Sequence, residues 1–356
     1  MASASTKAMR AWQYTSAAGG LHKSLTLSST AAHPRPTTPP KLAKDELLVR
    51  VRAAGLNPID YKLAELPYGM SRAMISVPAS PAMDFAGSVV AHGAETEFPV
   101  KTGDSVFGRL DPSQFGALGE FVVAKSPGCA TLPSTVSFEH ASGVGSAGQV
   151  AYRSVVYNVP EPSRERSAAN ANFRIFINGG SGGTGTFAIQ IAKLLGCQVT
   201  ASCSTGNVDL CQSLGADEVI DYTQGSIVDC LKAKGQVFDL VIDFVGLPYN
   251  LYKASDHFLV PNGKYVQVGA DMTLSSMGNL TSRMVLPSFL GGGSRKFALE
   301  AVKNSHRDLS RLGEWIESGK IKVVVDQIFA YEDAPKAYEK LRTGHAKGKI
   351  IVKGAP

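Results

Sequence analysis

The chain has 356 residues, of which 44% are hydrophobic and 19% charged, and its formal net charge is +6. This length allows two domains with separate cores, and no apolar run reaches the ~20 residues that a membrane-spanning helix needs. Lysine and arginine are scattered along the chain, which favours an ordinary solvated surface over a nucleic-acid interface and is compatible with a site for phosphate groups.

The cysteines and the N-terminal segment favour a protein of the cytosol. None of the five cysteines forms a Cys-x-x-Cys pair, which argues against a disulfide framework and against a four-cysteine zinc site. Residues 1–10 lack the apolar core of a secretion signal, but they are rich in Ser and Ala and contain Lys7 and Arg10. We therefore expect a cytoplasmic protein, with a mitochondrial address as the alternative.

The first ~140 residues are predicted to be rich in β-structure. Short runs of β-branched or aromatic residues alternate with Gly, Pro and Asp turns, and several prolines between residues 34 and 40 make a stiff surface loop. The predicted strands are residues 46–51, 87–91, 105–108 and 120–124.

From about residue 141 the pattern changes to helices that alternate with strands, which predicts a parallel sheet covered on both faces. A polar segment, residues 160–172, forms a surface loop before the first of these strands. The predicted strands are residues 173–177, 198–202, 219–220, 238–243 and 264–268, and the predicted helices are residues 186–195, 208–214, 226–233 and 251–258.

The C-terminal tail is expected to return to the first domain. It contains a helix with Leu309, Leu312 and Ile316 on one face, a strand at residues 322–325, a helix that begins near Asp333, and a last strand at residues 349–352. The predicted fold class is therefore α/β, with a β-rich domain of residues 1–140 and 273–356 and a doubly wound domain of residues 141–272.

Residues 177–185 contain the most informative motif of the chain, because a predicted strand enters it and a predicted helix leaves it. Gly180, Gly182 and Gly185 have the spacing of a dinucleotide-binding turn. In such a turn the first glycine permits a tight bend, the second lets the backbone approach a pyrophosphate, and the third packs the helix on the strand. A purely structural turn is the alternative. The expected cofactor contacts here are Gly180, Ser181, Gly182, Gly183, Thr184 and Gly185.

The residues that follow the second strand of this domain favour NADPH over NADH. An acid about 20 residues past the glycines usually binds the ribose hydroxyls of NAD, but this chain has Ser202, Ser204 and Asn207 there and no acid before Asp209. Hydroxyl and amide groups can donate to a 2′-phosphate that a carboxylate would repel. Tyr222 is expected to border the phosphate or the adenine, or else to pack as an ordinary surface tyrosine.

Further motifs extend over nearly the whole chain. They are residues 54–62 (AGLNPIDYK), 83–87 (MDFAG), 101–108 (KTGDSVFG), 213–222 (SLGADEVIDY), 243–246 (DFVG) and 344–350 (GHAKGKI). With the glycine turn, they make the chain resemble the zinc-independent quinone oxidoreductase branch of the medium-chain dehydrogenase/reductase superfamily, especially its fungal and plant members. The resemblance implies a GroES-like catalytic domain, a Rossmann domain and an active cleft between them.

The resemblance also implies chemistry without a metal. Zinc-dependent relatives carry a Cys after the first glycine motif and a His-Glu pair after the second, where this chain has Asn57 to Asp60 and Asp84-Phe85. The loop with four closely spaced cysteines is missing as well, so neither catalytic nor structural zinc is expected. Zinc-free transfer of a hydride from NADPH to the β-carbon of an enone needs only alignment, exclusion of water and hydrogen bonds to the enolate.

The place of the residues in these motifs gives the candidate catalytic residues Asn57, Asp60, Tyr61 and Lys62. Asn57 is expected near the nicotinamide ribose, with a turn-forming Asn-Pro as the alternative. Asp60 and Lys62 are expected beside the cleft, or else as a local ion pair that holds the loop. Tyr61 and Tyr152 are candidate donors to the substrate oxygen, although an aromatic wall is the commoner role for such tyrosines.

Other cofactor contacts are expected at Val245 and Gly269, and at Phe289 and Leu290 in a glycine-rich segment, residues 288–294. That segment is predicted to be a mobile lid or a plain flexible connection. Related members often have Arg or Lys where this chain has Gly206, so its preference for NADPH is expected to be moderate.

These observations predict an NADPH-dependent reductase of quinones or of α,β-unsaturated ketones and aldehydes. The first alternative is a trans-acting enoyl reductase that serves a polyketide or fatty-acid synthase. The second is a cofactor-binding regulatory protein without catalytic activity. The expected partner is a small-molecule substrate, with neither nucleic acid nor a membrane span, and a homodimer is expected from the resemblance alone.

Overall fold

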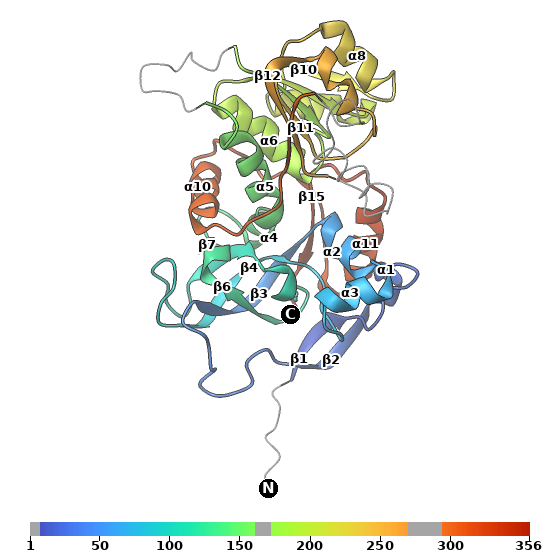
Figure 1. The fold of residues 1–356 in the computed structure, drawn as a ribbon. Coiled ribbons are helices and arrows are strands. Elements are labelled where there is room, and N and C mark those ends of the chain that lie inside the picture. Colours follow the sequence, from blue (N-terminus) through green and yellow to red (C-terminus); the bar gives the residue numbers. More distant parts are fainter. Residues whose placement is uncertain (1–7, 115, 161–171, 270–293) are drawn as a thin grey trace. The chain divides into compact units, whose positions relative to one another are not determined.

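The computed structural model describes residues 8–114, 116–160, 172–269 and 294–356. The chain divides into two compact units (Figure 1). Unit 1 comprises Met1–Gln149 and Lys303–Pro356, and unit 2 comprises Val150–Val302. The divisions therefore fall at residues 149/150 and 302/303, whereas the sequence pattern predicted 140/141 and 272/273.

Unit 1 contains a seven-stranded sheet with the order β14-β15-β3-β4-β5-β7, in which β6 also pairs with β3. Its strands are β3 (Glu46–Leu56), β4 (Asp84–His92), β5 (Ser105–Arg109), β6 (Phe121–Lys125), β7 (Cys129–Thr131), β14 (Val325–Phe329) and β15 (Lys349–Lys353). A separate two-stranded sheet is formed by β1 (Ala8–Gln13) and β2 (Thr26–Ala32). The antiparallel pairing of β15 with β3 ties the C-terminal tail to the N-terminal part of the chain.

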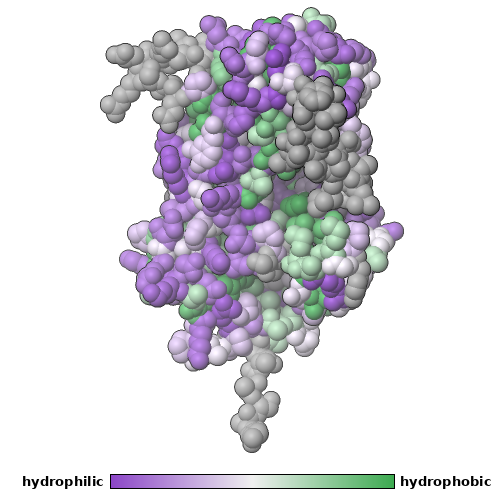
Figure 2. Space-filling view, in the orientation of Figure 1, coloured by the Kyte–Doolittle hydropathy of each residue, from purple (hydrophilic) through white to green (hydrophobic). Residues whose placement is uncertain are grey.

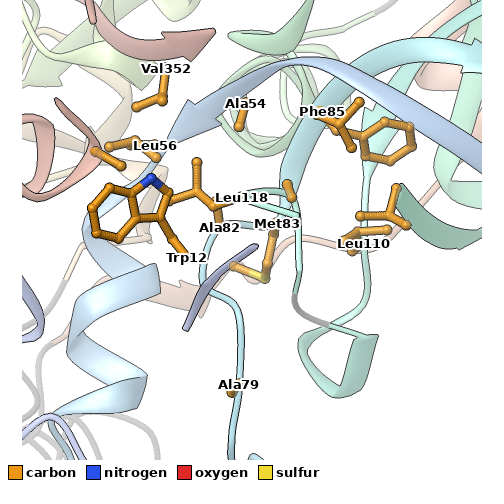
Figure 3. Close-up of a cluster of buried hydrophobic side chains, with 14 of the residues drawn as sticks. Trp12, Ala54, Leu56, Ala79, Ala82, Met83, Phe85, Leu110, Leu118 and Val352 are labelled. Atoms are coloured by element: carbon orange, nitrogen blue, oxygen red, sulfur yellow. The ribbon is translucent and has the colours of Figure 1, made fainter. Parts of the chain in front are cut away.

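Helices pack around this sheet. They are α1 (Leu21–Ser24), α2 (Pro58–Ala64), α3 (Tyr68–Met74), α4 (Phe138–Ser142), α10 (His306–Glu317) and α11 (Ala334–Arg342), and the division between the units falls within α5 (Gly145–Val156). Of these helices, α4 contacts β3 and β4, α10 contacts β7, and α11 contacts β15. The core gathers apolar side chains from both ends of the sequence, including Trp12, Leu56, Phe85 and Val352 (Figure 3). Trp12 keeps its polar atom satisfied there, because its indole N–H donates to the carbonyl of Tyr331 at 2.8 Å.

Unit 2 contains a six-stranded, entirely parallel sheet with the order β10-β9-β8-β11-β12-β13. Its strands are β8 (Arg174–Asn178), β9 (Gln198–Cys203), β10 (Glu218–Asp221), β11 (Phe238–Asp243), β12 (Leu259–Gln267) and β13 (Lys296–Leu299). The helices α6 (Gly183–Leu194), α7 (Val208–Ser213) and α8 (Ile227–Lys234) connect the first four strands. The strand order reverses between β8 and β11, and ligands of such sheets bind outside the carboxyl ends of the strands at this point.

Three local predictions differ from the structure. The predicted helix at residues 251–258 is reduced to a 3₁₀ turn at Lys253–His257, because the chain must enter β12 at Leu259. The predicted strand at residues 322–325 begins only at Val325, where pairing with β15 starts. β13 was assigned to the first domain but extends the sheet of unit 2, where Phe297 packs against Tyr252 with ring centroids 4.8 Å apart.

The surface is mainly hydrophilic on the face shown in Figure 2, and apolar side chains gather there over α2 and α3. Met70 and Met74 of α3 are among the exposed large apolar residues. Within the described ranges, no helix combines the length and the hydrophobicity that crossing a bilayer requires.

Candidate functional site

The glycine turn of unit 2 connects β8 to α6, and its glycines have different structural roles. Gly179 adopts a φ of +88°, so the left-handed bend falls one residue before the first glycine of the motif. A β-carbon on Gly185 would lie 2.1 Å from the carbonyl oxygen of Gly179, which explains why the helix can pack so closely on the turn. Packing also excludes a side chain at Gly180, since a β-carbon there would lie 2.8 Å from the β-carbon of Ala201.

Gly182 is the residue of the turn that leaves room for a ligand. It is the N-cap of α6 and has no side chain that could cap the amides of the first turn. A β-carbon at Gly182 would meet only the carbonyl oxygen of Gly179, at 3.6 Å, so the protein itself does not need a glycine here. Amides of a helix N-terminus beside open space fit a diphosphate group, and the residues present are therefore suited to a dinucleotide.

Two more of the predicted cofactor residues lie at the carboxyl edge of the sheet, where Val245 is close to the turn and Gly269 is close to Val245. A β-carbon on Gly179 would lie 2.6 Å from the Val245 side chain, and one on Gly269 would lie 2.7 Å from the Val245 amide nitrogen. The buried carboxylate of Asp243 organises this edge, because it accepts the amides of Val245 and Gly246 at 3.0 and 2.8 Å. Burial raises the pKa of Asp243, and these hydrogen bonds oppose that rise.

Ser202 supports the turn from within the protein rather than from its surface. It is fully buried, donates to Asn178 Oδ1 at 2.7 Å and accepts the amide of Gly179 at 3.0 Å. The sequence pattern predicted a direct contact between Ser202 and the cofactor phosphate. In the structure its hydroxyl is committed to the bend at Gly179.

The segment predicted to bind the 2′-phosphate lies between β9 and α7. The Asn207 amide donates to Ser181 Oγ at 3.1 Å and to Ser204 Oγ at 3.2 Å, so it links this segment to the glycine turn. Tyr222 is 47% exposed and is therefore accessible at the end of β10. Of the predicted contacts, Phe289 and Leu290 lie outside the described residues.

A carboxylate that the sequence analysis missed stands beside the same segment. Asp221, the last residue of β10, accepts the Thr205 hydroxyl at 2.6 Å and the Thr223 amide at 2.9 Å. The Thr205 hydrogen bond lowers the pKa of Asp221 below that of an ordinary carboxyl group. The parallel register, which pairs Asp221 with Cys203, brings this acid near the end of β9. Asp221 lies 18 residues past Cys203, the end of β9, so the residues directly after β9 gave no sign of an acid at this place.

The other predicted residues lie in unit 1, where β3 runs into α2 and β4 begins. Asn57 and Asp84 come from two separate sequence motifs, and the Asn57 amide donates to Asp84 Oδ2 at 2.8 Å. Asp84 Oδ1 accepts both the amide and the hydroxyl of Ser146, at 2.9 and 2.6 Å. Both side chains are buried, with 7% of Asn57 and none of Asp84 exposed, so this is an internal polar centre.

Lys349 completes this centre with a buried ammonium group. Only 2% of the residue is exposed. Its Nζ donates to Asn57 Oδ1 and, at 2.9 Å, to the carbonyl of Leu56, and it lies 3.6 Å from Asp84 Oδ2. Burial lowers the pKa of Lys349, and the Asp84 and Asp60 carboxylates oppose that effect. No role was predicted for this lysine from the sequence, although a charged residue directly before the apolar run Ile350 to Val352 was a signal that could have been used.

Asp60 is fully buried in the first turn of α2, and its Oδ2 accepts the backbone amide of Asn57, the N-cap residue, at 2.8 Å. Burial raises the pKa of Asp60 to about 7, and the charge of Asp84 adds to the rise. The hydrogen bond from Asn57 and the cations Lys349 and Arg109 oppose it. The structure thus gives Asp60 a helix-capping contact inside the protein.

Tyr61 and Lys62 follow within the first turns of α2, and both are half-buried. The guanidinium group of Arg342 lies over the Tyr61 ring, 5.0 Å from its centroid. Tyr152 is buried and packs edge-on against Tyr157 with centroids 6.0 Å apart, which matches the aromatic-wall alternative. Among the four candidate catalytic residues, only Tyr61 and Lys62 are therefore partly accessible.

A cavity of about 430 Å³ lies in unit 1 beside the carboxyl end of α2. Its wall combines apolar residues such as Leu66 and Val77 with the guanidinium groups of Arg72 and Arg342. Glu65 pairs with Arg342 in this wall and also accepts the amide of Leu21 at 2.7 Å. The cavity wall therefore combines apolar surface with the Glu65–Arg342 ion pair and the guanidinium group of Arg72.

Two family models match the chain: the alcohol dehydrogenase GroES-like domain at residues 43–152 and the zinc-binding dehydrogenase at residues 214–352. The trans-enoyl reductase pgmF of Aspergillus terreus is 46% identical over an alignment of 362 positions, which covers 99% of this chain and 98% of that protein. The quinone oxidoreductase of Coxiella burnetii is 26% identical, with a TM-score of 0.80 over 98% of this chain and 100% of that one. The Escherichia coli quinone oxidoreductase, solved in complex with NADPH, is 22% identical, with a TM-score of 0.74 over 97% and 100%.

The polar centre of unit 1 does not fit the zinc ion that the second family model names. Protein zinc sites are built mainly from Cys and His, whereas this centre combines an amide and a carboxylate with the ammonium of Lys349. A second cation at this place would be repelled by that ammonium. Within the described ranges, no group of three or more His, Cys, Asp or Glu side chains is placed to hold a metal ion.

Replacement of Gly182 by Val is expected to abolish NADPH binding while the fold is retained. The space beside Gly182 accepts a β-carbon in the protein alone but lies where a diphosphate would approach the α6 amides. Fluorescence titration with NADPH, together with a melting curve, measures both effects. Gly225→Val is the matched control, because nothing lies within 4 Å of a β-carbon there. Unchanged titration of the Gly182 variant would remove the turn as the cofactor site.

Asp60→Asn is expected to make stability less dependent on pH. The pKa of Asp60 is about 7 in the folded chain and about 3.9 in an unfolded one, so folding takes up a proton between these values. Its contribution to stability is complete below pH ~4 and is lost as the pH rises through ~7. The difference in melting temperature, variant minus wild type, should therefore increase between pH 5 and pH 8.

The exposed Asp209→Asn serves as the control for this experiment. If the melting temperatures of the Asp60 variant and the wild type changed in parallel with pH, the assignment of the raised pKa to Asp60 would be contradicted.

Proposed function

This chain belongs to the medium-chain dehydrogenase/reductase superfamily, and we propose that it is an NADPH-dependent, zinc-independent enoyl reductase. Its substrates in this proposal are α,β-unsaturated carbonyl compounds, and enoyl thioesters in particular. The observation that carries the proposal is the 46% identity to a protein named as a trans-enoyl reductase, which extends over nearly the full length of both chains. The glycine turn at the strand-order reversal supports the use of a dinucleotide.

When bound, NADPH would supply a hydride to the β-carbon of the substrate, and a proton taken up from water at the α-carbon would complete the reduction of the double bond. The α6 amides at Gly182 would bind the diphosphate of NADPH, and the segment from Ser204 to Asn207, with Tyr222, would bind its 2′-phosphate. Val245 and Gly269, on the same carboxyl edge of the sheet, would contact the rest of the cofactor. Ser202 acts indirectly, through its hydrogen bond to the amide of Gly179.

The residues of unit 1 contribute to the reaction through α2. Tyr61 and Lys62 are half-buried and can donate hydrogen bonds to the carbonyl oxygen as negative charge develops on it. Asn57 and Asp60 are buried at the start of the same helix and hold it in place. The nearby cavity, which has both apolar surface and guanidinium groups, suits a chain with an apolar body and a polar end.

Reduction of quinones is the second candidate function, because the chain shares 26% identity and a TM-score of 0.80 with a quinone oxidoreductase. Reduction of a quinone and of an enone both begin with hydride addition to a conjugated system. The same residues would therefore serve either substrate. The five cysteines are all free thiols, which agrees with our proposal of a cytoplasmic location. A homodimer stays a prediction.

The proposed function is tested by NADPH consumption with quinones, enones, alkenals and carrier-bound enoyl thioesters. We expect the highest kcat/KM with the enoyl thioesters and loss of activity in the Gly182→Val variant. Turnover of quinones but not of enoyl substrates would assign the second candidate function instead. NADPH binding without turnover of any substrate, with the synthase partner present, would indicate a regulatory protein.

Gly206→Arg is expected to increase the preference for NADPH over NADH. Gly206 is exposed, and nothing lies within 4 Å of a β-carbon there, so the longer side chain can be accommodated. A hydrogen bond to a charged group contributes about 1.5–3 kcal/mol, and the low end suits an exposed site. We expect the ratio of NADH to NADPH dissociation constants to rise about tenfold.

Asp221→Asn should change the same ratio in the same direction, because it removes the charge beside Thr205. Gly225→Arg is the control for a new arginine elsewhere in unit 2. An unchanged ratio in both the Gly206 and the Asp221 variants would contradict the proposed phosphate position.

A further inference from the structure

We propose that Lys349 is a positioning residue whose buried ammonium group replaces a metal ion as the central cation of unit 1. It binds the Asn57 side chain and the Leu56 carbonyl and lies 3.6 Å from Asp84. These contacts join the start of β15 to the end of β3 and the start of β4. The role rests on the proposed function, because α2, which begins at this junction, carries the candidate donors Tyr61 and Lys62.

The first argument is that Lys349 and Asp84 together dictate the orientation of the Asn57 amide. An ammonium group only donates hydrogen bonds and an ionised carboxylate only accepts them. The Asn57 oxygen must therefore face Lys349 and its nitrogen must face Asp84, as observed. Without the charge of Lys349, the amide could rotate and the beginning of α2 would lose one of its supports.

The second argument concerns charge. Asp84 is entirely buried, and a buried charge without a partner is costly. Lys349 is the lysine whose ammonium group reaches this carboxylate. The groups that face Lys349 are Asp84 from β4 and Asp60 from α2, and both favour its charged form. Tyr338 of α11 and Arg109 of β5 act on Asp60 in turn. The buried Asp84 carboxylate thus needs a cation beside it. In the described part of the chain, the groups around it lack the Cys and His side chains that zinc prefers.

The third argument is that the junction leaves no space for a different arrangement. A β-carbon on Gly145, at the start of α5, would lie 2.7 Å from Asp84 Oδ1. A β-carbon on Gly143 would lie 3.3 Å from the Lys349 side chain. Asp84 and Lys349 are therefore enclosed by backbone as well as by each other. A close-packed enclosure of this kind suits an ammonium group whose role is to hold α2, with its candidate donors Tyr61 and Lys62, in one position.

The experiment compares Lys349→Met, which removes the charge, with Lys349→Arg, which keeps it, and with Lys353→Met on the exposed end of the same strand as the control. With the best substrate of the screen, we expect Lys349→Met to lower kcat at least tenfold. The NADPH dissociation constant should stay within twofold of the wild type, because the glycine turn belongs to unit 2. Lys353→Met should match the wild type in both values.

Asp84→Asn tests the charge by its effect on the pH profile and does not require the Lys349 variants to fold. Asp84 raises the pKa of Lys349, so its neutralisation lowers that pKa further. The pH above which kcat declines should therefore shift to a lower value in Asp84→Asn. In Lys349→Arg this decline should vanish, because a guanidinium group does not lose its proton in proteins.

An NMR titration of the full chain with ¹³C-labelled lysine gives a readout that is independent of activity. We expect one Cε resonance to titrate below the range of ordinary lysines, to be absent from Lys349→Met and to shift to lower pH in Asp84→Asn. A Lys349 resonance that titrates with the surface lysines, or wild-type kcat in Lys349→Met, would overturn the proposal. If the wild type reduces no substrate, the proposed function fails, and a Lys349 resonance unaffected by Asp84→Asn would also reject Lys349 as the central cation.

Discussion

The burial of charge at the start of α2 is the constraint on which unit 1 depends. Asp84 is entirely enclosed, and its carboxylate is held by Ser146, by the Asn57 amide and by the nearby ammonium of Lys349. Removal of either charge would leave the other unpaired in a medium of low dielectric constant. Strands β3, β4 and β15 and helices α2 and α5 therefore meet in one arrangement, and that arrangement places Tyr61 on its helix.

Unit 2 depends on a different constraint: backbone segments around the glycine turn lie so close together that only glycine fits between them. The carbonyl oxygen of Gly179 lies where a β-carbon of Gly185 would be, and the Phe244 carbonyl lies where one of Gly269 would be. Glycine at these positions lets α6 and the ends of β11 and β12 close around the turn. Gly179, Gly180 and Gly185 of the turn all have such close neighbours, whereas the nearest atom to a β-carbon on Gly182 would lie 3.6 Å away, so the space beside it is left for a ligand. The contrast separates glycines that the fold requires from the one that a cofactor would require.

The comparisons and the two constraints agree on the class of protein. The family models match residues 43–152 and 214–352, and the six parallel strands have the order of a dinucleotide-binding sheet. Reduction of a conjugated carbonyl asks the protein only to align two reactants and to stabilise charge on an oxygen. An internal ammonium in place of a metal is compatible with that task, because no Lewis acid needs to touch the substrate.

Local patterns in the sequence were enough to predict those features that require no knowledge of long-range contacts. The alternation of strands and helices and the spacing of the glycines predicted the parallel sheet and its turn, and the replacement of Cys and His residues predicted a centre without zinc ligands. Tertiary structure decided what depends on contacts between distant residues. Lys349 meets Asn57 across 292 positions of the chain, Asp221 reaches Thr205 through strand register, and Ser202 turns inward to Gly179. Such contacts arise when strands pair and cores close, and a local pattern carries no record of them.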